Sequence, residues 1–380
     1  MFDRDVPYNT LPDLPPANTE LETRAVLKQA IAANRALAEL KGAGDLIPNQ
    51  ALLVRVIGLQ EAKLSSEIEN IVTTNDELYR AFSEDAIHGT DLQTKEVLSY
   101  NEALWHGYNR LREGLPLATR LFVEVVRVIK QSTVDIRNTP GTRIQNSVTG
   151  ATIYTPPEGE RVVRDKLANL ENFLHADNGI DPLVKMAVMH YQFEAIHPFT
   201  DGNGRTGRIL NILYLIDAGL LDIPVLYLSR YIIDHKPDYY AGLRRVTEEH
   251  RWEDWVLFML RAVETTALET RRQVQAIREL MQETMDRVRT ELPKMYSKDL
   301  IDVLFAQPYC RIRFLEEAGI AQRQTASKYL QELANIGLLR RVAKGREAYF
   351  INTPFLDLLT RSEADRGPEP TSGSTIRSLP

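Results

Sequence analysis

Apolar residues recur at helical spacing along most of this chain, and this periodicity limits its fold more than any other feature. Residues 20–41 carry one apolar stripe, formed by Val26, Ala30, Ala33, Leu37 and Leu40 and widened by Leu27 and Ile31. Comparable runs predict helices over residues 49–71, 75–86, 92–107, 117–131, 160–176, 181–195, 204–217, 236–249, 252–264 and 266–291. We therefore expect a mainly α fold.

Residues 136–157 depart from this helical pattern. Thr, Val, Ile, Tyr, Gly and Pro dominate there, and two short β-prone runs flank polar residues and glycine. This composition predicts a β-hairpin over about residues 144–154, set within the helical core.

The C-terminal quarter has the composition of a separate module. Pro293 marks its start, and residues 294–355 contain helical runs at 297–306, 309–318 and 322–336, followed by a Gly-centred hairpin at 339–350. Residues 361–380 are rich in Gly, Pro, Ser and charge, which predicts a disordered tail.

Composition excludes several classes of protein. With 380 residues, of which 43% are hydrophobic, the chain can bury a sizeable core, in two or three domains rather than one. The net charge of -6 argues against nucleic-acid binding by the whole chain. A single cysteine, Cys310, rules out an intrachain disulfide. Neither a signal peptide nor a membrane span is apparent, so we expect a cytoplasmic protein without a membrane partner.

The run from His197 to Arg208 carries the clearest chemistry. The segment 201–204, Asp-Gly-Asn-Gly, lies between two predicted helices, where glycines permit a tight turn and backbone N–H groups can bind an anion. Arg205 and Arg208 lie three residues apart, on one helix face, as suits a polyphosphate. His197 can accept a proton near neutral pH, and Asp201 can hold Mg²⁺ beside phosphates.

This run resembles the signature of Fic proteins, His-Pro-Phe-x-Asp-Gly-Asn-Gly-Arg-x-x-Arg, at every fixed position. The resemblance covers roughly the first 290 residues. It implies an N-terminal arm and inhibitory helical segment over residues 1–95 and a Fic helical core over residues 96–290. It also implies that the hairpin at 144–154 is a flap that aligns an extended target segment by strand addition.

The resemblance also implies roles for individual residues. His197 would be the general base that deprotonates the attacking hydroxyl, and Asp201 would hold Mg²⁺ bridging the α- and β-phosphates of ATP. Arg205 and Arg208 would neutralise the β/γ end and the leaving pyrophosphate. The implied ATP-binding residues are Glu69, His197, Gly202, Asn203, Gly204, Arg205, Thr206, Gly207, Arg208 and Tyr240.

A built-in inhibitor is implied by residues 65–70, Ser-Ser-Glu-Ile-Glu-Asn, near the end of a predicted helix. They fit the family's inhibitory pattern, in which Ser65, Glu69 and Asn70 are the fixed residues. The Glu69 carboxylate could pair with Arg208 through charge-assisted hydrogen bonds. Arg208 could then not hold the γ-phosphate, and ATP would bind with its α-phosphate misaligned for in-line attack.

Residues 294–355 resemble a winged helix-turn-helix, with a recognition helix near 322–333. Its exposed N-terminal residues would be Arg323, Gln324, Thr325, Ser327 and Lys328, and the wing would carry Arg340, Arg341, Lys344 and Arg346. Such a module binds DNA in some proteins and mediates protein contacts or dimers in others, so DNA and a homodimer are both candidate partners.

The sequence therefore predicts an enzyme that transfers AMP from ATP to a Ser, Thr or Tyr hydroxyl of a target protein or of itself, held back by Glu69. Two alternatives stay open. One is a Fic enzyme that uses another nucleotide or also removes AMP. The other is a DNA-binding regulator whose Fic core senses a nucleotide.

Overall fold

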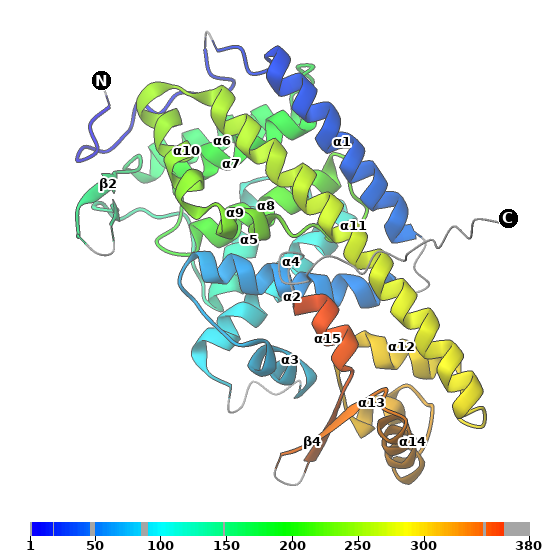
Figure 1. The fold of residues 1–380 in the computed structure, drawn as a ribbon. Coiled ribbons are helices and arrows are strands. Elements are labelled where there is room, and N and C mark those ends of the chain that lie inside the picture. Colours follow the sequence, from blue (N-terminus) through cyan, green and yellow to red (C-terminus); the bar gives the residue numbers. More distant parts are fainter. Residues whose placement is uncertain are drawn as a thin grey trace, which may run out of the picture.

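A computed structural model describes residues 2–17, 19–45, 50–84, 90–146, 149–344 and 347–360, and it confirms a mainly α fold (Figure 1). The predicted disordered tail, 361–380, lies outside these residues. The helices before the C-terminal quarter are α1 (Arg24–Asp45), α2 (Gln50–Ile68), α3 (Asn75–Glu84), α4 (Leu92–Arg112), α5 (Thr119–Lys130), α6 (Glu160–His175), α7 (Pro182–Ile196), α8 (Asn203–Asp217), α9 (Leu228–Asp234), α10 (Lys236–Glu249) and α11 (Trp252–Glu291).

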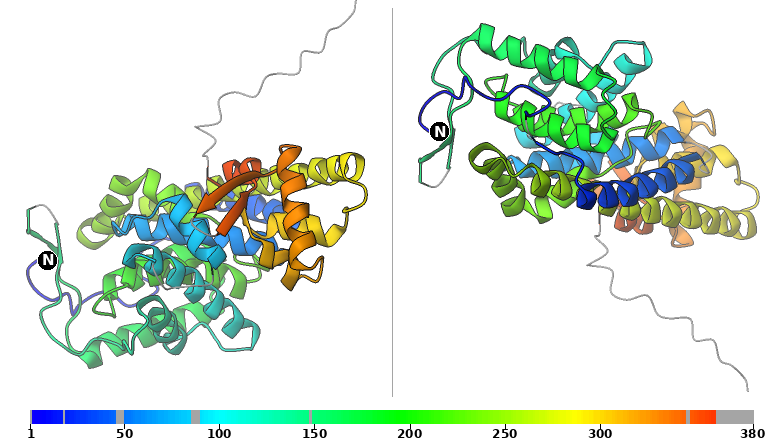
Figure 2. Two further views of the ribbon diagram at one scale, coloured as in Figure 1. Left: turned by 90° about the horizontal axis from the view of Figure 1, so that it is seen from below. Right: turned by 90° about the horizontal axis from the view of Figure 1, so that it is seen from above.

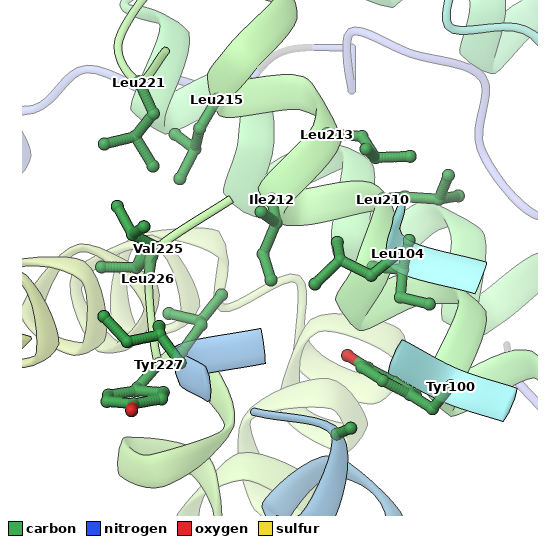
Figure 3. Packing of buried hydrophobic residues seen from close by; sticks show 14 of the residues in the cluster. Tyr100, Leu104, Leu210, Ile212, Leu213, Leu215, Leu221, Val225, Leu226 and Tyr227 are labelled. Atoms are coloured by element: carbon green, nitrogen blue, oxygen red, sulfur yellow. The ribbon is translucent and has the colours of Figure 1, made fainter. Parts of the chain in front are cut away.

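Helices α7 and α8 form the centre of the core. Nearly every residue of α7 is buried, and α8 packs against α4, α5 and α7. Figure 3 shows this packing around α8, where Leu210 of α8 points toward Leu104 of α4. A helix that is apolar on all sides must be surrounded by others. The turn between α7 and α8 is thereby fixed at both ends.

Helix α1 lies along the long helix α11 (Figures 1 and 2). Its predicted stripe is buried at Val26, Ala30, Ala33, Leu37 and Leu40. The predicted widening of that stripe is wrong, because Leu27 and Ile31 are 43% and 71% exposed.

The predicted hairpin at 144–154 is present. Strands β1 (Ile144–Gln145) and β2 (Thr152–Tyr154) pair antiparallel. The N-terminal arm runs beside it (Figure 2), where the Tyr8 N–H donates to the Thr155 carbonyl at 3.0 Å and Phe2 stacks on Tyr154. The arm therefore supports the base of this hairpin.

The C-terminal quarter contains α12 (Lys298–Ala306), β3 (Tyr309–Cys310), α13 (Ile312–Glu317), α14 (Arg323–Asn335), β4 (Arg340–Lys344), β5 (Glu347–Ile351) and α15 (Thr353–Thr360). Its antiparallel sheet has the strand order β3-β5-β4. One face of this sheet packs on α3, where the Tyr309 hydroxyl donates to Asp76 at 2.6 Å and Tyr309 stacks on Tyr79. Helix α15 returns to pack on α2 and α11.

Several predicted boundaries are wrong. The expected helix at 309–318 begins with a strand instead, because Tyr309 and Cys310 pair with Ile351 and Phe350, which are distant in sequence. The two helices expected at 252–264 and 266–291 are one continuous helix. The Thr266 hydroxyl donates to the Ala262 carbonyl at 2.7 Å, so its hydrogen bond is made within the helix and the helix continues through this residue. Helices α9 and α15 were not expected.

None of the helices that the structure describes has the length and apolar character that crossing a membrane requires.

Candidate functional site

The turn between α7 and α8 holds the motif in a fixed loop. His197 ends α7 in the left-handed conformation (φ 49°, ψ 59°), and Gly202 precedes α8 at φ 84°. The Asn203 side chain bonds the Phe199 backbone twice, accepting from its N–H at 2.9 Å and donating to its carbonyl at 2.8 Å. Phe199 is fully buried. Asn203 therefore closes the loop, rather than leaving its amide free for a ligand.

His197 is held by its backbone and has a neutral ring. Arg137 donates from Nε to the His197 carbonyl at 2.7 Å and from a terminal nitrogen to the Ile196 carbonyl at 3.1 Å. Burial, together with the charge of Arg137, lowers the pKa of His197 to about 4. Within the described residues, His197 Nδ1 is buried and has no hydrogen-bond partner. At neutral pH the imidazole is therefore a base able to accept a proton.

Asp201 and Arg205 are each paired with a residue from another helix. Lys130 Nζ of α5 lies 2.5 Å from Asp201 Oδ2, and an Arg205 terminal nitrogen lies 2.7 Å from Glu96 Oε2 of α4. Burial acts to raise the pKa of Asp201, but the hydrogen bond and charge of Lys130 outweigh it and the pKa lies below its usual value. Asp201 is thus an ionised, partly exposed carboxylate.

Arg208 is almost completely buried, at 1% exposure, and is held by the end of α2. It donates from Nε to Ser65 Oγ at 2.7 Å, and from one terminal nitrogen to the Ser65 carbonyl at 2.9 Å and to Glu69 Oε1 at 2.8 Å. The ion pair expected between Glu69 and Arg208 is therefore present. Burial alone would lower the pKa of Arg208, but Glu69 and other acidic groups around it raise the pKa, so the guanidinium stays charged.

The Glu69 carboxylate also lies against the first turn of α8. A Cβ atom added to Gly204 would collide with Glu69 Oε1, so glycine is what permits this approach. The N-terminus of a helix favours a negative charge. Glu69 therefore lies where the loop and Arg208 would otherwise attract an anionic group of a ligand.

Two further acids lie near Arg208, Glu61, which is buried, and Glu194, which is half-buried. Glu61 of α2, eight residues before Glu69, accepts from the Ser229 N–H at 3.0 Å and from the Tyr100 hydroxyl at 3.2 Å, and burial raises its pKa to about 6. Glu194 of α7 packs behind Gly207, and burial raises its pKa to about 7. Glu194 Oε1 has no hydrogen-bond partner among the described residues. The site thus holds more acid than Arg208 alone can balance.

Tyr240 lies at the open side of the site, 46% exposed, whereas Tyr239 is buried and hydrogen-bonded to His190 Nε2 at 2.8 Å. Burial and the charge of Glu69 raise the pKa of Tyr240 to about 12. Its ring is therefore an uncharged surface on which a flat ligand could pack. No cluster of three or more His, Cys, Asp or Glu side chains suited to a metal occurs in the described part of the chain.

The structure brings together the predicted residues Ser65, Glu69, Gly204 and Arg208, which are in direct contact. Asn70 lies in the turn that ends α2, at φ 62°, and Thr206 is buried in α8. Gly207 serves helix packing, since a Cβ there would strike Glu194 and Phe193.

Sequence reasoning missed Glu61, Glu96, Lys130, Arg137 and Glu194. Each of them reaches the site only through tertiary contacts. The spacing of Glu61, Ser65 and Glu69 at every fourth residue, along α2 and the turn that ends it, was the one signal in the sequence that could have identified Glu61.

Three family models match the chain. Residues 27–109 match the model described as Fic/DOC family N-terminal, and residues 117–215 match that of the Fic/DOC family. Residues 280–355 match the model described as protein adenylyltransferase SoFic-like, C-terminal domain.

Curated relatives match over shorter stretches. A probable protein adenylyltransferase of Aquifex aeolicus is 40% identical over 83 residues, which are 22% of this chain and 25% of that protein. The protein adenylyltransferase Fic of Nematostella vectensis is 26% identical over 176 residues, 46% of this chain and 39% of that protein. The chain thus spans between a quarter and two fifths of the length of these two relatives.

A solved structure supports the fold. The crystal structure of a Fic family protein from Desulfovibrio desulfuricans superposes with a TM-score of 0.55 at 20% identity, covering 87% of this chain and 96% of that one. The chain therefore contains a Fic/DOC family domain, preceded by a Fic/DOC N-terminal segment and followed by a SoFic-like C-terminal domain.

Proposed function

We propose that this chain is a protein adenylyltransferase, which transfers AMP from ATP to a Ser, Thr or Tyr hydroxyl of a target protein or of itself, and that Glu69 restrains it. The names of its curated relatives support the reaction class. The observation that carries the proposal is the position of Glu69, against Gly204 and paired with Arg208.

In the proposed reaction, the target hydroxyl oxygen attacks the α-phosphorus of ATP in line with the leaving pyrophosphate. The neutral His197 imidazole accepts the hydroxyl proton, and the bond between the α-phosphorus and the β-phosphate oxygen breaks. The N–H groups at the start of α8, with Arg205 and Arg208, take up the charge that moves to the pyrophosphate. Tyr240 offers a ring beside the nucleoside.

The Asp201 carboxylate fits the proposed Mg²⁺. This ion favours one or two carboxylates together with phosphate oxygens, and Asp201 is ionised and 62% exposed at its side chain. When bound, Mg²⁺ would neutralise phosphate charge. Lys130 holds the same carboxylate through its ammonium group.

The proposed inhibition follows because Glu69 and the γ-phosphate of ATP compete for the guanidinium of Arg208. Arg208 has 1% exposure and donates to Ser65 and Glu69, so it cannot also bind a γ-phosphate without releasing Glu69. A carboxylate at the phosphate position also repels the incoming nucleotide. ATP that enters beside Glu69 would therefore be displaced from in-line geometry, which can reduce a rate by orders of magnitude.

The proposal is tested by incubating the full chain with ATP, Mg²⁺ and a cell lysate. Mass spectrometry then measures the mass that AMP adds to the chain itself and to lysate proteins. Glu69→Gly should add AMP about a hundredfold faster than the wild-type chain. Adding His197→Ala to Glu69→Gly should lower that rate about a thousandfold, as expected for the loss of a general base. A folded Glu69→Gly chain that transfers no AMP would contradict the proposal and favour a nucleotide sensor.

For the C-terminal region we propose the winged helix-turn-helix arrangement, supported by the element order α12, β3, α13, α14, β4, β5 and the sheet order β3-β5-β4. The cytoplasmic location, a homodimer and a DNA partner stay predictions.

A further inference from the structure

A hollow of about 460 Å³ lies in the C-terminal region, between helices α13 and α14 and the β4–β5 hairpin. Among the described residues, its charged lining consists of Arg311, Arg313, Arg323 and Arg341, against one acid, Glu316. Four guanidinium groups and one carboxylate on one concave surface leave an excess of positive charge there, which attracts an anion. The lining therefore selects a ligand with concentrated negative charge.

Two of these arginines have no acidic partner among the described residues. Arg323 and Arg341 are exposed and form no ion pair with any residue in the described ranges. Arg313 donates to the Ser83 carbonyl at 2.6 Å, and Arg311 lies 5.5 Å from the centre of the Tyr349 ring. The hollow thus combines two arginines held in place with two that can turn toward a ligand.

The rest of the lining suits the remainder of a small molecule. Ser327 and Gln331 of α14 follow Arg323 at intervals of four residues, so all three face the hollow from one side. Opposite them lie Ala343, Ala348 and Phe350, which share one face of the sheet with Arg341. An apolar wall beside hydrogen-bonding groups is typical of pockets that hold nucleotide-sized ligands, and the volume lies in their range.

The hollow overlaps the surface expected to meet DNA only in part, because Arg323, Ser327 and Arg341 belong to both. Gln324, Thr325 and Lys328 are exposed on α14 but do not line it. Arg340 also lies outside it, since it neighbours Arg341 along β4 and faces the other side of the sheet. Side chains that contact a DNA duplex extend outward from the protein surface, whereas a concave site encloses a small ligand.

We propose that this hollow is a binding site for a small phosphorylated molecule of nucleotide size, separate from the catalytic site. Its arginines would grip the phosphate groups by paired N–H donors, and the wall at Phe350 would contact the less polar part. This site goes beyond the proposed AMP transfer and does not depend on it.

The test is isothermal titration calorimetry of inorganic pyrophosphate into the full chain without Mg²⁺. Arg323→Gln with Arg341→Gln should weaken the hollow's binding about a hundredfold, which corresponds to about tenfold for each arginine. The matched control is Lys328→Gln with Arg340→Gln, which removes the same charge from the same two elements outside the hollow. It should bind as the wild-type chain does. The proposed catalytic site is the same in the wild-type chain and in both double variants. Any pyrophosphate that binds there therefore contributes equally to the three titrations, and their differences report on the hollow.

Three outcomes would overturn the proposal. The first is a wild-type chain that binds no more pyrophosphate than the Arg323→Gln, Arg341→Gln variant. The second is an equal loss in both double variants, which indicates nonspecific attraction. The third is retention on a short duplex DNA that depends on Arg323 and Arg341 while pyrophosphate binding does not, which assigns the hollow to nucleic acid. Thermal unfolding of each variant checks that the fold is intact.

Discussion

The two groups of arginines in this molecule differ in what they are paired with. At the turn between α7 and α8, Arg205 and Arg208 are at most 3% exposed at their side chains, and each meets a carboxylate within 2.8 Å. In the C-terminal hollow, Arg323 and Arg341 are exposed and meet no acid among the described residues. The first group already holds anions supplied by the chain, whereas the second is available to a ligand.

This difference separates two kinds of anion site. A buried arginine needs hydrogen-bond acceptors around it, and at this turn Glu96 and Glu69 supply them to Arg205 and Arg208 as carboxylates. A nucleotide phosphate that binds these arginines must therefore displace carboxylates of the protein. Exposed arginines remain hydrated and need no such substitute. The catalytic site should therefore respond strongly to removal of acids, and the following variants test that expectation.

The largest effect is expected on stability, at Glu194. Its pKa is 4.5 when unfolded and about 7 when folded, so between these values the native state binds more protons and stability falls as pH rises. Glu194→Gln removes this charge and should raise the free energy of unfolding by about 3 kcal/mol above neutral pH, with little change below the unfolded pKa.

Urea unfolding at about pH 4 and about pH 8 measures this difference. Glu102→Gln, at an exposed position of α4, is the control and should show no such pH dependence. An unchanged stability of Glu194→Gln at the higher pH would mean that Arg208 fully compensates the Glu194 charge.

A smaller effect is expected at Glu96, which holds Arg205 at 2.7 Å. Glu96→Gln in the Glu69→Gly background frees the Arg205 charge for the nucleotide, so the KM for ATP should fall about fivefold with little change in kcat. Initial rates of AMP transfer measure both constants, and Glu102→Gln on the same helix is the control. A fall in kcat with KM unchanged would show instead that Glu96 orients Arg205.

The sequence was sufficient to predict the local parts of the site. Glycine at positions 202 and 204 and the helices on both sides predicted the motif loop, and the resemblance to Fic proteins implied the pairing of Glu69 with Arg208, 139 residues apart. The mainly α fold followed from periodicity alone.

The remainder depended on tertiary contacts. Lys130 and Glu96 lie 71 and 109 residues from their partners, and nothing in their local sequence marks them. Tyr309 and Cys310 form a strand only because β5 lies beside them. Interactions of this kind depend on the assembled fold, whereas helical periodicity is a local property.

The smallest effect is expected at Lys130, whose ammonium group lies 2.5 Å from Asp201 Oδ2. A cation on this carboxylate competes with the proposed Mg²⁺, but the Asp201 side chain is 62% exposed and screened by water, so the influence of Lys130 is modest. Lys130→Gln in the Glu69→Gly background should lower the Mg²⁺ concentration for half-maximal transfer about threefold. A titration of Mg²⁺ at saturating ATP measures this, with Lys28→Gln, an exposed lysine of α1, as the control. A higher Mg²⁺ requirement would show instead that Lys130 orients Asp201 for the ion. The ion pair would then assist Mg²⁺ binding, whereas a lower requirement means that Lys130 competes with Mg²⁺ for the carboxylate.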